Sequence, residues 1–175
     1  MRYVVGIDLG HRGAIATLSI DGTIAHLTDM PIEKMKVNGK ERSFLDLAAF
    51  AAILNTFDEE VLVVVEKLHT VAGPISSSAS NFSLGYSLGT CEALLHDRLC
   101  QTQWVTAQSW QKHYDLRGKK RGEIKFLVNT LAQQLFPKAE LVTPRGRILD
   151  GRSDALLIAE FGRRKVLDEP EFGKI

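Results

Sequence analysis

Three short apolar segments near the start of the chain predict β-strands. Gly10 and Gly13 interrupt the pattern after the first segment, and Asp21-Gly22, a pair typical of tight hairpin turns, follows the second. Because the connections are short, we expect consecutive strands to run antiparallel. The three segments cover residues 3–9, 14–20 and 23–28.

After the polar residues 31–42, which are expected to form a loop, the pattern alternates between helices and strands. A helix is predicted from Ser43, because Asp46 follows three residues later as in a capping box and apolar residues recur at helical spacing up to Leu54. The continuous apolar run 61–65 is typical of a strand buried on both faces. Further helices are predicted over residues 81–98, from 108, over 123–135 and over 150–164, with a strand over 102–106.

This order of elements predicts an α/β fold with a mixed five-stranded sheet flanked by helices on both faces. Three antiparallel strands come first, and the later strands are joined through helices and so run parallel. With right-handed crossover connections, the first and fourth strands are expected to lie side by side. The 175 residues suit one domain covering residues 1–175.

Composition narrows the class of protein only slightly. Hydrophobic residues make up 45% and charged residues 25%, as in an ordinary globular protein, and the net charge of +1 points neither toward nor away from nucleic acid. Cys91 and Cys100 lack the spacing of a metal site or a disulfide framework. With neither a signal peptide nor a membrane-spanning run in the pattern, we expect a cytoplasmic protein without a membrane partner.

Two acidic residues end otherwise apolar strands. Asp8 interrupts the first strand, and Glu66 directly follows the run 61–65. A surface aspartate at a strand end is the simpler interpretation of Asp8, but burying an unpaired carboxylate is costly, so a partner is expected. If the two strands are neighbours, both carboxylates emerge at the same end of the sheet, where a bound cation relieves their repulsion.

A second acidic pair, Asp150 and Asp154, opens the last predicted helix. Their spacing of four residues places both on one helical face, and Asp154 precedes an apolar stretch and is expected to face inward. One of the two could instead be an ordinary helix cap, and this alternative applies more to Asp150 than to Asp154. Inward-facing carboxylates of this kind suggest a functional site.

The four carboxylates Asp8, Glu66, Asp150 and Asp154 predict a site for hard cations. Oxygen ligands without a Cys or His cluster favour Mg²⁺ or Mn²⁺ over Zn²⁺. Two such ions, about 4 Å apart, activate a water and stabilise the leaving oxygen in an in-line displacement at phosphorus. The pattern therefore predicts phosphodiester hydrolysis with two ions in each active site and no organic cofactor.

Four short motifs follow one another along the chain: Gly-Ile-Asp-Leu-Gly at 6–10, Val-Val-Glu at 64–66, Ser-Trp-Gln-Lys at 109–112 and Ser-Asp-Ala-Leu-Leu-Ile-Ala-Glu at 153–160. In these motifs and in their order, the sequence resembles the RuvC-like Holliday-junction resolvases, particularly the compact phage-type members. The resemblance implies an RNase H-like fold, a homodimer, and two-metal cleavage of branched DNA during recombination and repair. In many such enzymes the last two acids lie three residues apart, whereas here they lie four apart, so Asp150 matches the family pattern less closely than Asp154 does.

The resemblance also assigns roles to basic residues. Lys112 matches the family's active-site lysine, and Lys120 or Arg121 roughly matches a second basic position. Residues 112–125 hold six Lys or Arg and two acids, an excess that suits a phosphate backbone, although a solvated basic loop is the alternative. His69 stands near a position where related resolvases place a base-stacking aromatic residue, or it is simply a loop histidine. The DNA-binding candidates are Arg12, His69, Lys119, Lys120 and Arg121.

Other functions fit the sequence less well. The motif at 6–10 also opens actin-like and sugar-kinase ATPases, but those need two domains and further glycine-rich phosphate motifs. A nuclease of the same fold acting on flaps, forks or structured RNA remains an alternative, because fold does not fix substrate. A non-catalytic DNA-binding module should lack one of the acids, and none is missing. For the dimer, we expect the helix over 81–98 to supply contacts through Phe82, Tyr86 and Ala93, while its stripe of Leu84, Leu88, Cys91, Leu95 and Leu99 faces the core.

Overall fold

The computed structural model describes the chain except for residues 38, 68–77, 97, 117, 170–171 and 173–175. Seven strands and five helices are present in the described part. The strands are β1 (Tyr3–Asp8), β2 (Ala14–Ser19), β3 (Ile24–Asp29), β4 (Ile32–Val37), β5 (Lys40–Leu45), β6 (Val61–Glu66) and β7 (Gln101–Val105). The helices are α1 (Leu47–Leu54), α2 (Ser78–His96), α3 (Ala107–His113), α4 (Arg121–Leu135) and α5 (Asp150–Asp168).

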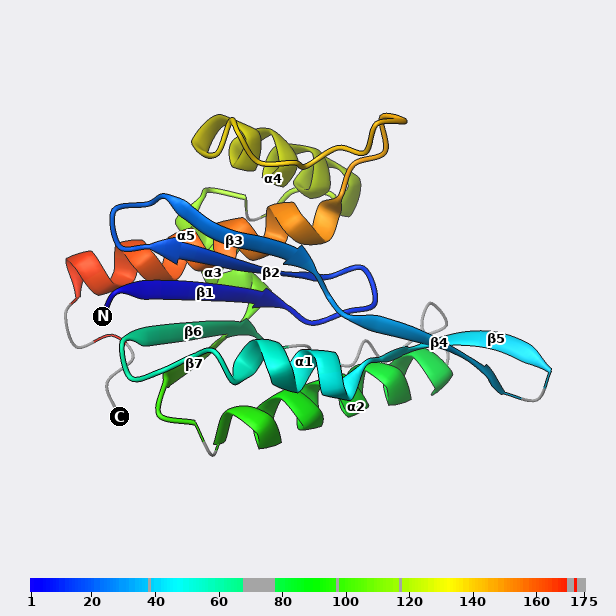
Figure 1. Cartoon of the computed structure of the whole chain (residues 1–175). Helices are drawn as coiled ribbons and strands as arrows, with labels where there is room; N and C mark the ends of the chain where they lie inside the picture. Colours follow the sequence, from blue (N-terminus) through cyan, green and yellow to red (C-terminus); the bar gives the residue numbers. More distant parts are fainter. Residues whose placement is uncertain (38, 68–77, 97, 117, 170–171, 173–175) are drawn as a thin grey trace.

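Five of the strands form one mixed sheet, in the order β3-β2-β1-β6-β7 (Figure 1). The pairs β1–β2 and β2–β3 are antiparallel, whereas β1–β6 and β6–β7 are parallel. The predicted five-stranded sheet and the predicted parallel neighbours are both confirmed. In the register of β1 with β6, Ile7 lies opposite Val65, so the next residues along, Asp8 and Glu66, end neighbouring strands at the same edge.

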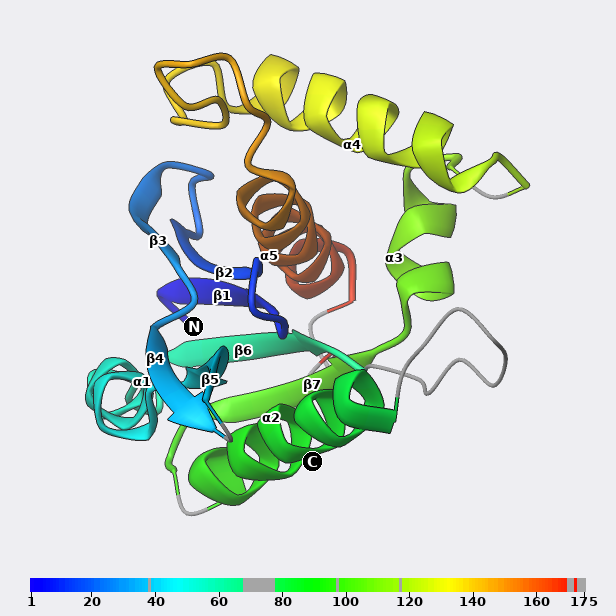
Figure 2. The same ribbon diagram turned by 90° about the vertical axis from the view of Figure 1, so that its right-hand side faces the viewer.

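Helices cover both faces of this sheet, with α3, α4 and α5 on one side and α1 and α2 on the other (Figure 2). Alternate residues of each strand point to opposite faces, so each strand contributes to two apolar clusters. Val4, Leu62 and Val64 pack with α5, while Val5 and Val63 face α1 and α2. This two-sided burial explains why residues 61–65 are apolar without interruption, as the sequence predicted.

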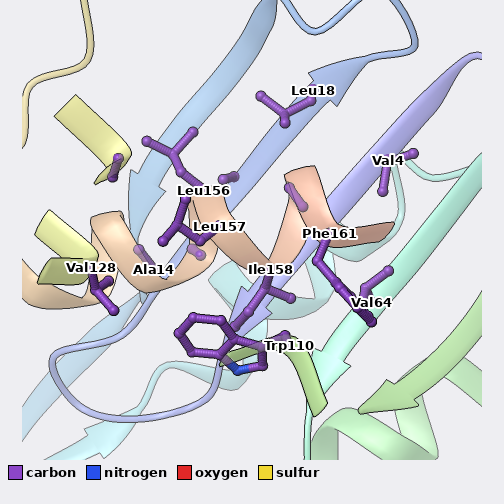
Figure 3. Packing of buried hydrophobic residues seen from close by; sticks show 14 of the residues in the cluster. Val4, Ala14, Leu18, Val64, Trp110, Val128, Leu156, Leu157, Ile158 and Phe161 are labelled. Carbon is purple, nitrogen blue, oxygen red and sulfur yellow. The ribbon is translucent and has the colours of Figure 1, made fainter. Parts of the chain in front are cut away.

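The central helix α5 lies unusually close to β1, and Gly6 makes the approach possible. A Cβ at position 6 would lie 2.2 Å from the carbonyl oxygen of Ala155 and 2.4 Å from the amide nitrogen of Ala159. Both are backbone atoms, so any side chain here forces the helix off the sheet. Figure 3 shows Leu156, Ile158 and Phe161 of α5 in the resulting core. The close packing brings the start of α5 over the end of β1.

Most of the predicted loop at residues 31–42 is strand instead: residues 32–37 belong to β4, and β5 begins at Lys40. The strands β4 and β5 pair antiparallel as a separate two-stranded hairpin that extends away from the main sheet (Figure 1). The turn includes Gly39, whose φ of 75° lies in the left-handed region that glycine adopts without strain. The prediction failed because exposed charged side chains hide the alternation expected of a half-buried strand. The Asn-Gly pair at 38–39 is itself a hairpin signal.

The first helix starts later than predicted. It begins at Leu47, and the carboxylate of its N-cap residue Asp46 accepts a hydrogen bond from the amide of Ala49 at 3.0 Å. Ser43 belongs to β5 instead of opening the helix. The predicted capping box was therefore wrong. Asp46 caps the helix, and Ser43 takes no part in the cap.

The predicted apolar stripe along α2 holds only in part. Cys91 and Leu95 are buried, and Leu88 packs against the same cluster. Leu99, however, lies beyond the end of the helix and is 79% exposed. Its side chain therefore does not continue the stripe, because the helix ends at His96. Among the described residues, no helix combines the length and apolar character required to cross a bilayer.

Candidate active site

Asp8 and Glu66 mark the edge of the sheet where the candidate site lies. The side chain of Asp8 is half-buried, and its pKa is raised well above the usual aspartate range. Loss of hydration is the largest cause, followed by the nearby charges of Asp154 and Glu66. The negative charges of carboxylates from other elements of the fold therefore act on Asp8.

The first turns of α5 supply two of those carboxylates. Burial, then the charges of Glu66 and Asp150, raise the pKa of Asp154 to about 7. Asp150 also contributes to the raised pKa of Asp8. The N-cap position of α5 is Leu149, and no side chain caps this helix. Asp150 thus stands in the first turn as a member of the acidic cluster, and the cap alternative finds no support in its contacts.

Gly151 fits the start of α5 against the loop that follows β1. A Cβ at this position would lie 2.0 Å from the carbonyl oxygen of Arg12 and 2.7 Å from the Cα of Gly13. The glycine between the two aspartates therefore allows backbone-to-backbone contact with the loop at residues 10–13. This contact, together with the close approach at Gly6, sets Asp150 and Asp154 beside Asp8.

Lys125 of α4 brings a positive charge into the acidic cluster. Its ammonium group forms an ion pair with the carboxylate of Asp150, and its charge lowers the pKa of both Asp8 and Asp154. In the sequence, this lysine stands out only as part of the basic excess over 112–125. Lys125 and Asp150 are 25 residues apart, so no local sequence pattern identifies their contact.

A broad groove of about 1340 Å³ opens beside these residues. Its acidic end contains Asp8, Asp150 and Asp154, with Lys125 next to them. The loop at residues 10–13, including Arg12, forms another part of the lining. The first turns of α2 and residues 42–44 of β5 complete it. The acidic cluster is therefore open to a ligand much larger than a metal ion.

Solved structures with the same arrangement of elements come from the resolvase RuvC. One is T. thermophilus RuvC in complex with a Holliday junction substrate, with a TM-score of 0.62 and 13% sequence identity over 95% of this chain and 96% of that chain. The chain has a RuvC-like fold. Another structure of Thermus thermophilus RuvC matches with a TM-score of 0.55 and 16% identity over 93% and 95% of the two chains. No protein-family model and no curated protein matches the sequence.

Within this RuvC-like fold, Trp110 of α3 holds one of the four acids in place. Its indole nitrogen Nε1 donates a hydrogen bond to Oε2 of Glu66 at 2.9 Å, and its side chain is only 1% exposed. No sequence pattern indicates this bond, because Trp110 and Glu66 are 44 residues apart. A buried aromatic ring that donates to a carboxylate fixes the rotamer of that carboxylate.

The structure does not bring Lys112 to the acidic cluster. Its side chain is exposed on α3, and it does not line the groove. The positive charge that acts on Asp8 and Asp154 comes from Lys125 instead. The active-site role that the family resemblance assigned to Lys112 stays a prediction, and Lys125 is a second candidate for the same role.

The other basic candidates lie in different places. Arg12 lines the groove, and its side chain makes no ion pair with any described residue. Lys119 and Lys120 are exposed just before α4, and Nζ of Lys119 lies 3.5 Å from Oε1 of Glu123 in the first turn of that helix. Arg121 is the first residue of α4. His69 falls outside the described residues.

The donor set of the cluster suits a hard cation, although the side chains are not yet arranged around one. All four ligand candidates are carboxylates, which favour Mg²⁺ and Mn²⁺. Among the described residues, no three acidic, histidine or cysteine side chains stand close enough to hold an ion as placed. The raised pKa values of Asp8 and Asp154 record a repulsion that a divalent cation relieves. The chemistry of the residues thus fits a metal, and the charge of Lys125 partly offsets theirs.

Proposed function

We propose that this protein is a metal-dependent endodeoxyribonuclease that cleaves Holliday junctions and related branched DNA. One observation carries the proposal: four carboxylates from β1, β6 and α5 act on one another at the edge of a RuvC-like sheet. Such a concentration of half-buried acidic charge is costly without a counter-charge, and carboxylates perturbed in this way cluster at functional sites. The groove beside the cluster gives a DNA strand access to it.

In this proposal, Asp8, Glu66, Asp150 and Asp154 hold two Mg²⁺ or Mn²⁺ ions, which activate a water and stabilise the leaving 3′ oxygen when bound. Trp110 keeps the carboxylate of Glu66 in one orientation through its hydrogen bond. Lys125 leaves Asp150 and contacts phosphate oxygen, where its charge stabilises the transition state.

DNA binding is proposed to rest on basic residues around the groove. Arg12 stands in its lining, without an ion pair among the described residues, and is available to a phosphate. Lys119, Lys120 and Arg121 lie at or just before the start of α4, the helix that also carries Lys125. These residues extend the positive charge along the backbone of a bound strand.

The protein is proposed to act as a homodimer. A four-way junction contains two equivalent strands, and a two-fold dimer presents one active site to each. The outward side of α2 offers a contact surface, with Ala93 exposed beyond the groove. Light scattering on the protein, alone and with junction DNA, should give the mass of two chains. A monomer mass in both samples moves the proposed substrate toward flaps and forks, where a single cut suffices.

A panel of labelled substrates tests the proposed activity. With Mg²⁺, we expect the protein to cut a four-way junction, with slower cutting of forks and flaps and little of linear duplex. Asp8→Asn serves as the matched control, because it keeps the side-chain shape but removes a ligand charge. Equal cutting of all four substrates means a nuclease without structure preference, whereas cutting of flaps alone favours the alternative substrate class.

A further inference from the structure

Several arginines of this protein have their charge engaged within the fold, whereas others do not. Arg2 forms an ion pair with Glu60, and Arg163 and Arg164 share the carboxylate of Glu160. Four exposed arginines have neither an ion pair nor a side-chain hydrogen bond within the described part of the chain, namely Arg12, Arg42, Arg145 and Arg147. The first two line the groove, which leaves the second two without an assigned role.

This second pair lies on residues 141–149, here called the 141–149 loop, which is folded as a short hairpin. The amide of Leu149 donates to the carbonyl of Leu141 at 2.9 Å, and the amide of Thr143 donates to the carbonyl of Arg147 at 2.8 Å. In return, the amide of Arg147 donates to Oγ1 of Thr143 at 3.0 Å. Leu141 is buried and anchors the base, while Gly146, with a φ of 79°, allows the turn. A ligand that binds this loop therefore has little backbone to order.

The 141–149 loop ends directly before Asp150 of the acidic cluster. The Cα of Arg147 can lie at most about 11 Å from that of Asp150, and the Cα of Arg145 at most about 18 Å. In Figure 1 the segment between α4 and α5, drawn in gold and orange, reaches past the start of α5 toward the same end of the molecule as the β4–β5 hairpin. Neither arginine belongs to the lining of the groove. The two free charges thus lie close to the proposed cutting site but outside the groove.

We propose that the 141–149 loop binds the backbone of a double-helical DNA arm, with Arg145 and Arg147 on phosphates within about five nucleotides of the phosphate that is cut. Phosphates along one strand advance by about 3.4 Å per nucleotide, so a reach of about 18 Å covers about five of them. The planar guanidinium group of arginine pairs with phosphate oxygens through two parallel hydrogen bonds. The inference rests on the proposed nuclease function and adds where the duplex beside the cut is held.

A double helix suits the 141–149 loop better than an unpaired strand does. Residues 141–149 include no aromatic residue on which a base could stack, and no acid that would repel phosphate. The loop can therefore read only the sugar-phosphate backbone. A duplex carries about one negative charge per 1.7 Å of its axis, twice the density of one of its strands, so it gains more from two fixed cations.

A second copy of this chain is the main competing partner for the 141–149 loop. Val142 and Ile148 face each other across the loop and are 44% and 41% exposed. Two partly exposed aliphatic side chains are ordinary on a protein surface and form no large apolar patch. Covering the two free arginines with protein would require acidic partners, whereas DNA supplies their counter-charge directly.

The test compares the full-length parent with the double variant Arg145→Ala/Arg147→Ala. Affinities for a four-way junction, a linear duplex and a single strand are measured over a range of salt concentrations in Ca²⁺, in which we expect little cutting. The double variant should bind the junction and the duplex at least about tenfold more weakly, and the slope of log affinity against log salt should fall by roughly two, at about 0.9 per lost phosphate contact. Single-strand affinity should change by less than about threefold.

Two control variants separate phosphate contact from a general effect of charge. Arg145→Lys/Arg147→Lys keeps both charges and should retain the salt slope of the parent. Arg2→Ala/Lys165→Ala removes the same net charge from surface ion pairs near the start of β1 and the end of α5, away from the acidic cluster. This variant should bind DNA as the parent does, because exposed ion pairs contribute little.

Three results would overturn the proposal. The first is unchanged junction affinity and salt slope in the double alanine variant. The second is an equal loss on the single strand or in the Arg2→Ala/Lys165→Ala variant, since either means attraction of DNA without a defined duplex contact. The third is a change from dimer to monomer in the double alanine variant with DNA affinity per chain retained, which makes the loop a protein interface.

Neutral methylphosphonate linkages, placed one at a time along an arm of the junction, locate the contact. A linkage at a contacted phosphate should weaken binding by the parent but have no further effect on the double alanine variant. If no position behaves in this way, the assignment to backbone phosphates is wrong.

Cleavage of the unmodified junction in Mg²⁺ separates this proposal from the proposed function. If the parent cuts the junction but the double alanine variant binds duplex normally, the nuclease function stands and the inference about the 141–149 loop fails. If the parent cuts no branched DNA at all, the nuclease function fails, whatever the loop binds.

Discussion

At the scale of single residues, the site is a set of acidic groups whose charge is only partly offset. Asp8 and Asp154 have raised pKa values because they lose hydration and because the other carboxylates lie nearby. Lys125 is the cation that opposes this repulsion. Asp8 and Glu66 could be predicted because each ends an apolar strand, and Asp150 and Asp154 because they lie four residues apart at the start of a predicted helix. The roles of Lys125 and Trp110 could not be predicted. Lys125 lies 25 residues from its partner Asp150, and Trp110 lies 44 residues from its partner Glu66, so neither contact leaves a local sequence pattern.

The raised pKa of Asp154 predicts a stability that depends on pH. An aspartate titrates near 3.8 in the unfolded chain and near 7 here, so between these values the folded protein holds a proton that the unfolded chain has lost. The metal-free protein therefore loses stability as pH rises from about 4 to about 7. Asp154→Asn removes this loss, and we expect its melting temperature in EDTA to exceed that of the parent by roughly 2–4 °C or more at pH 8.

At pH 4 the same two proteins should melt together, because Asp154 is protonated in the folded parent. Asp168→Asn, at the exposed end of the same helix, is the control and should change little at either pH. A melting temperature of Asp154→Asn equal to or below that of the parent at pH 8 contradicts the idea of a destabilising buried charge.

The bond between Trp110 and Glu66 makes Trp110 a positioning residue for the metal site. Trp110→Phe keeps an aromatic ring in the core but removes the donor, and we expect Mn²⁺ to bind about 10-fold to 100-fold more weakly. Trp104→Phe is the control, because Trp104 packs against the other core cluster. Calorimetric titration of both variants measures the effect. Equal Mn²⁺ affinity in the two variants limits Trp110 to packing.

Two lysines compete for the active-site role, and their alanine variants can distinguish them. Lys125→Ala should slow junction cleavage on the order of 100-fold while weakening DNA binding much less, as expected when a charge stabilises the transition state. Lys112→Ala should show a smaller loss, since its side chain lies outside the groove. Single-turnover rates and binding constants give both quantities. The reverse order of effects restores the family-based assignment of Lys112.

At the scale of elements, the sequence predicted the five strands of the main sheet and the helices between them. These elements have a clear apolar pattern because helices cover both faces of the sheet. The hairpin of β4 and β5 escaped prediction because its outer part, residues 33–36 and 41–42, is exposed and mostly charged. The start of α1 was misplaced because Ser43 and Asp46 both suit a helix N-terminus, and only the structure assigns the cap to Asp46.

The contact between β1 and α5 gives an element-scale prediction. Gly6→Ala places a Cβ 2.2 Å from a backbone oxygen of α5, so the helix must shift away from the strand. We expect a loss of folding free energy of about 2 kcal/mol or more, measured by urea unfolding, together with weaker Mn²⁺ binding.

Gly89→Ala is the matched control for this variant. A Cβ at position 89 meets no other atom within 4 Å, and alanine favours helix over glycine by roughly 0.5–1 kcal/mol. That variant should be as stable as the parent or slightly more stable. If Gly6→Ala unfolds at the same urea concentration as Gly89→Ala, the close packing does not hold α5 in place.

At the scale of the whole molecule, the fold joins an acidic cluster, a basic helix start and a broad groove at one end of the sheet. The carboxylates come from strand ends and a helix start that are distant in sequence. The groove that links them to α2 and the hairpin has no sequence signal, because it arises from the packing of elements. The sequence therefore predicted which acids meet at this edge of the sheet, but not the shape of their surroundings.

The central claim is that this acidic cluster cuts branched DNA with bound metal. The most direct measurement incubates the full-length protein with an end-labelled four-way junction in Mg²⁺, in Ca²⁺ and in EDTA. We expect paired nicks placed symmetrically across the junction in Mg²⁺, little cutting in Ca²⁺, whose looser coordination misplaces the water, and none in EDTA. Undiminished cutting in EDTA, or an intact junction in both Mg²⁺ and Mn²⁺, contradicts it.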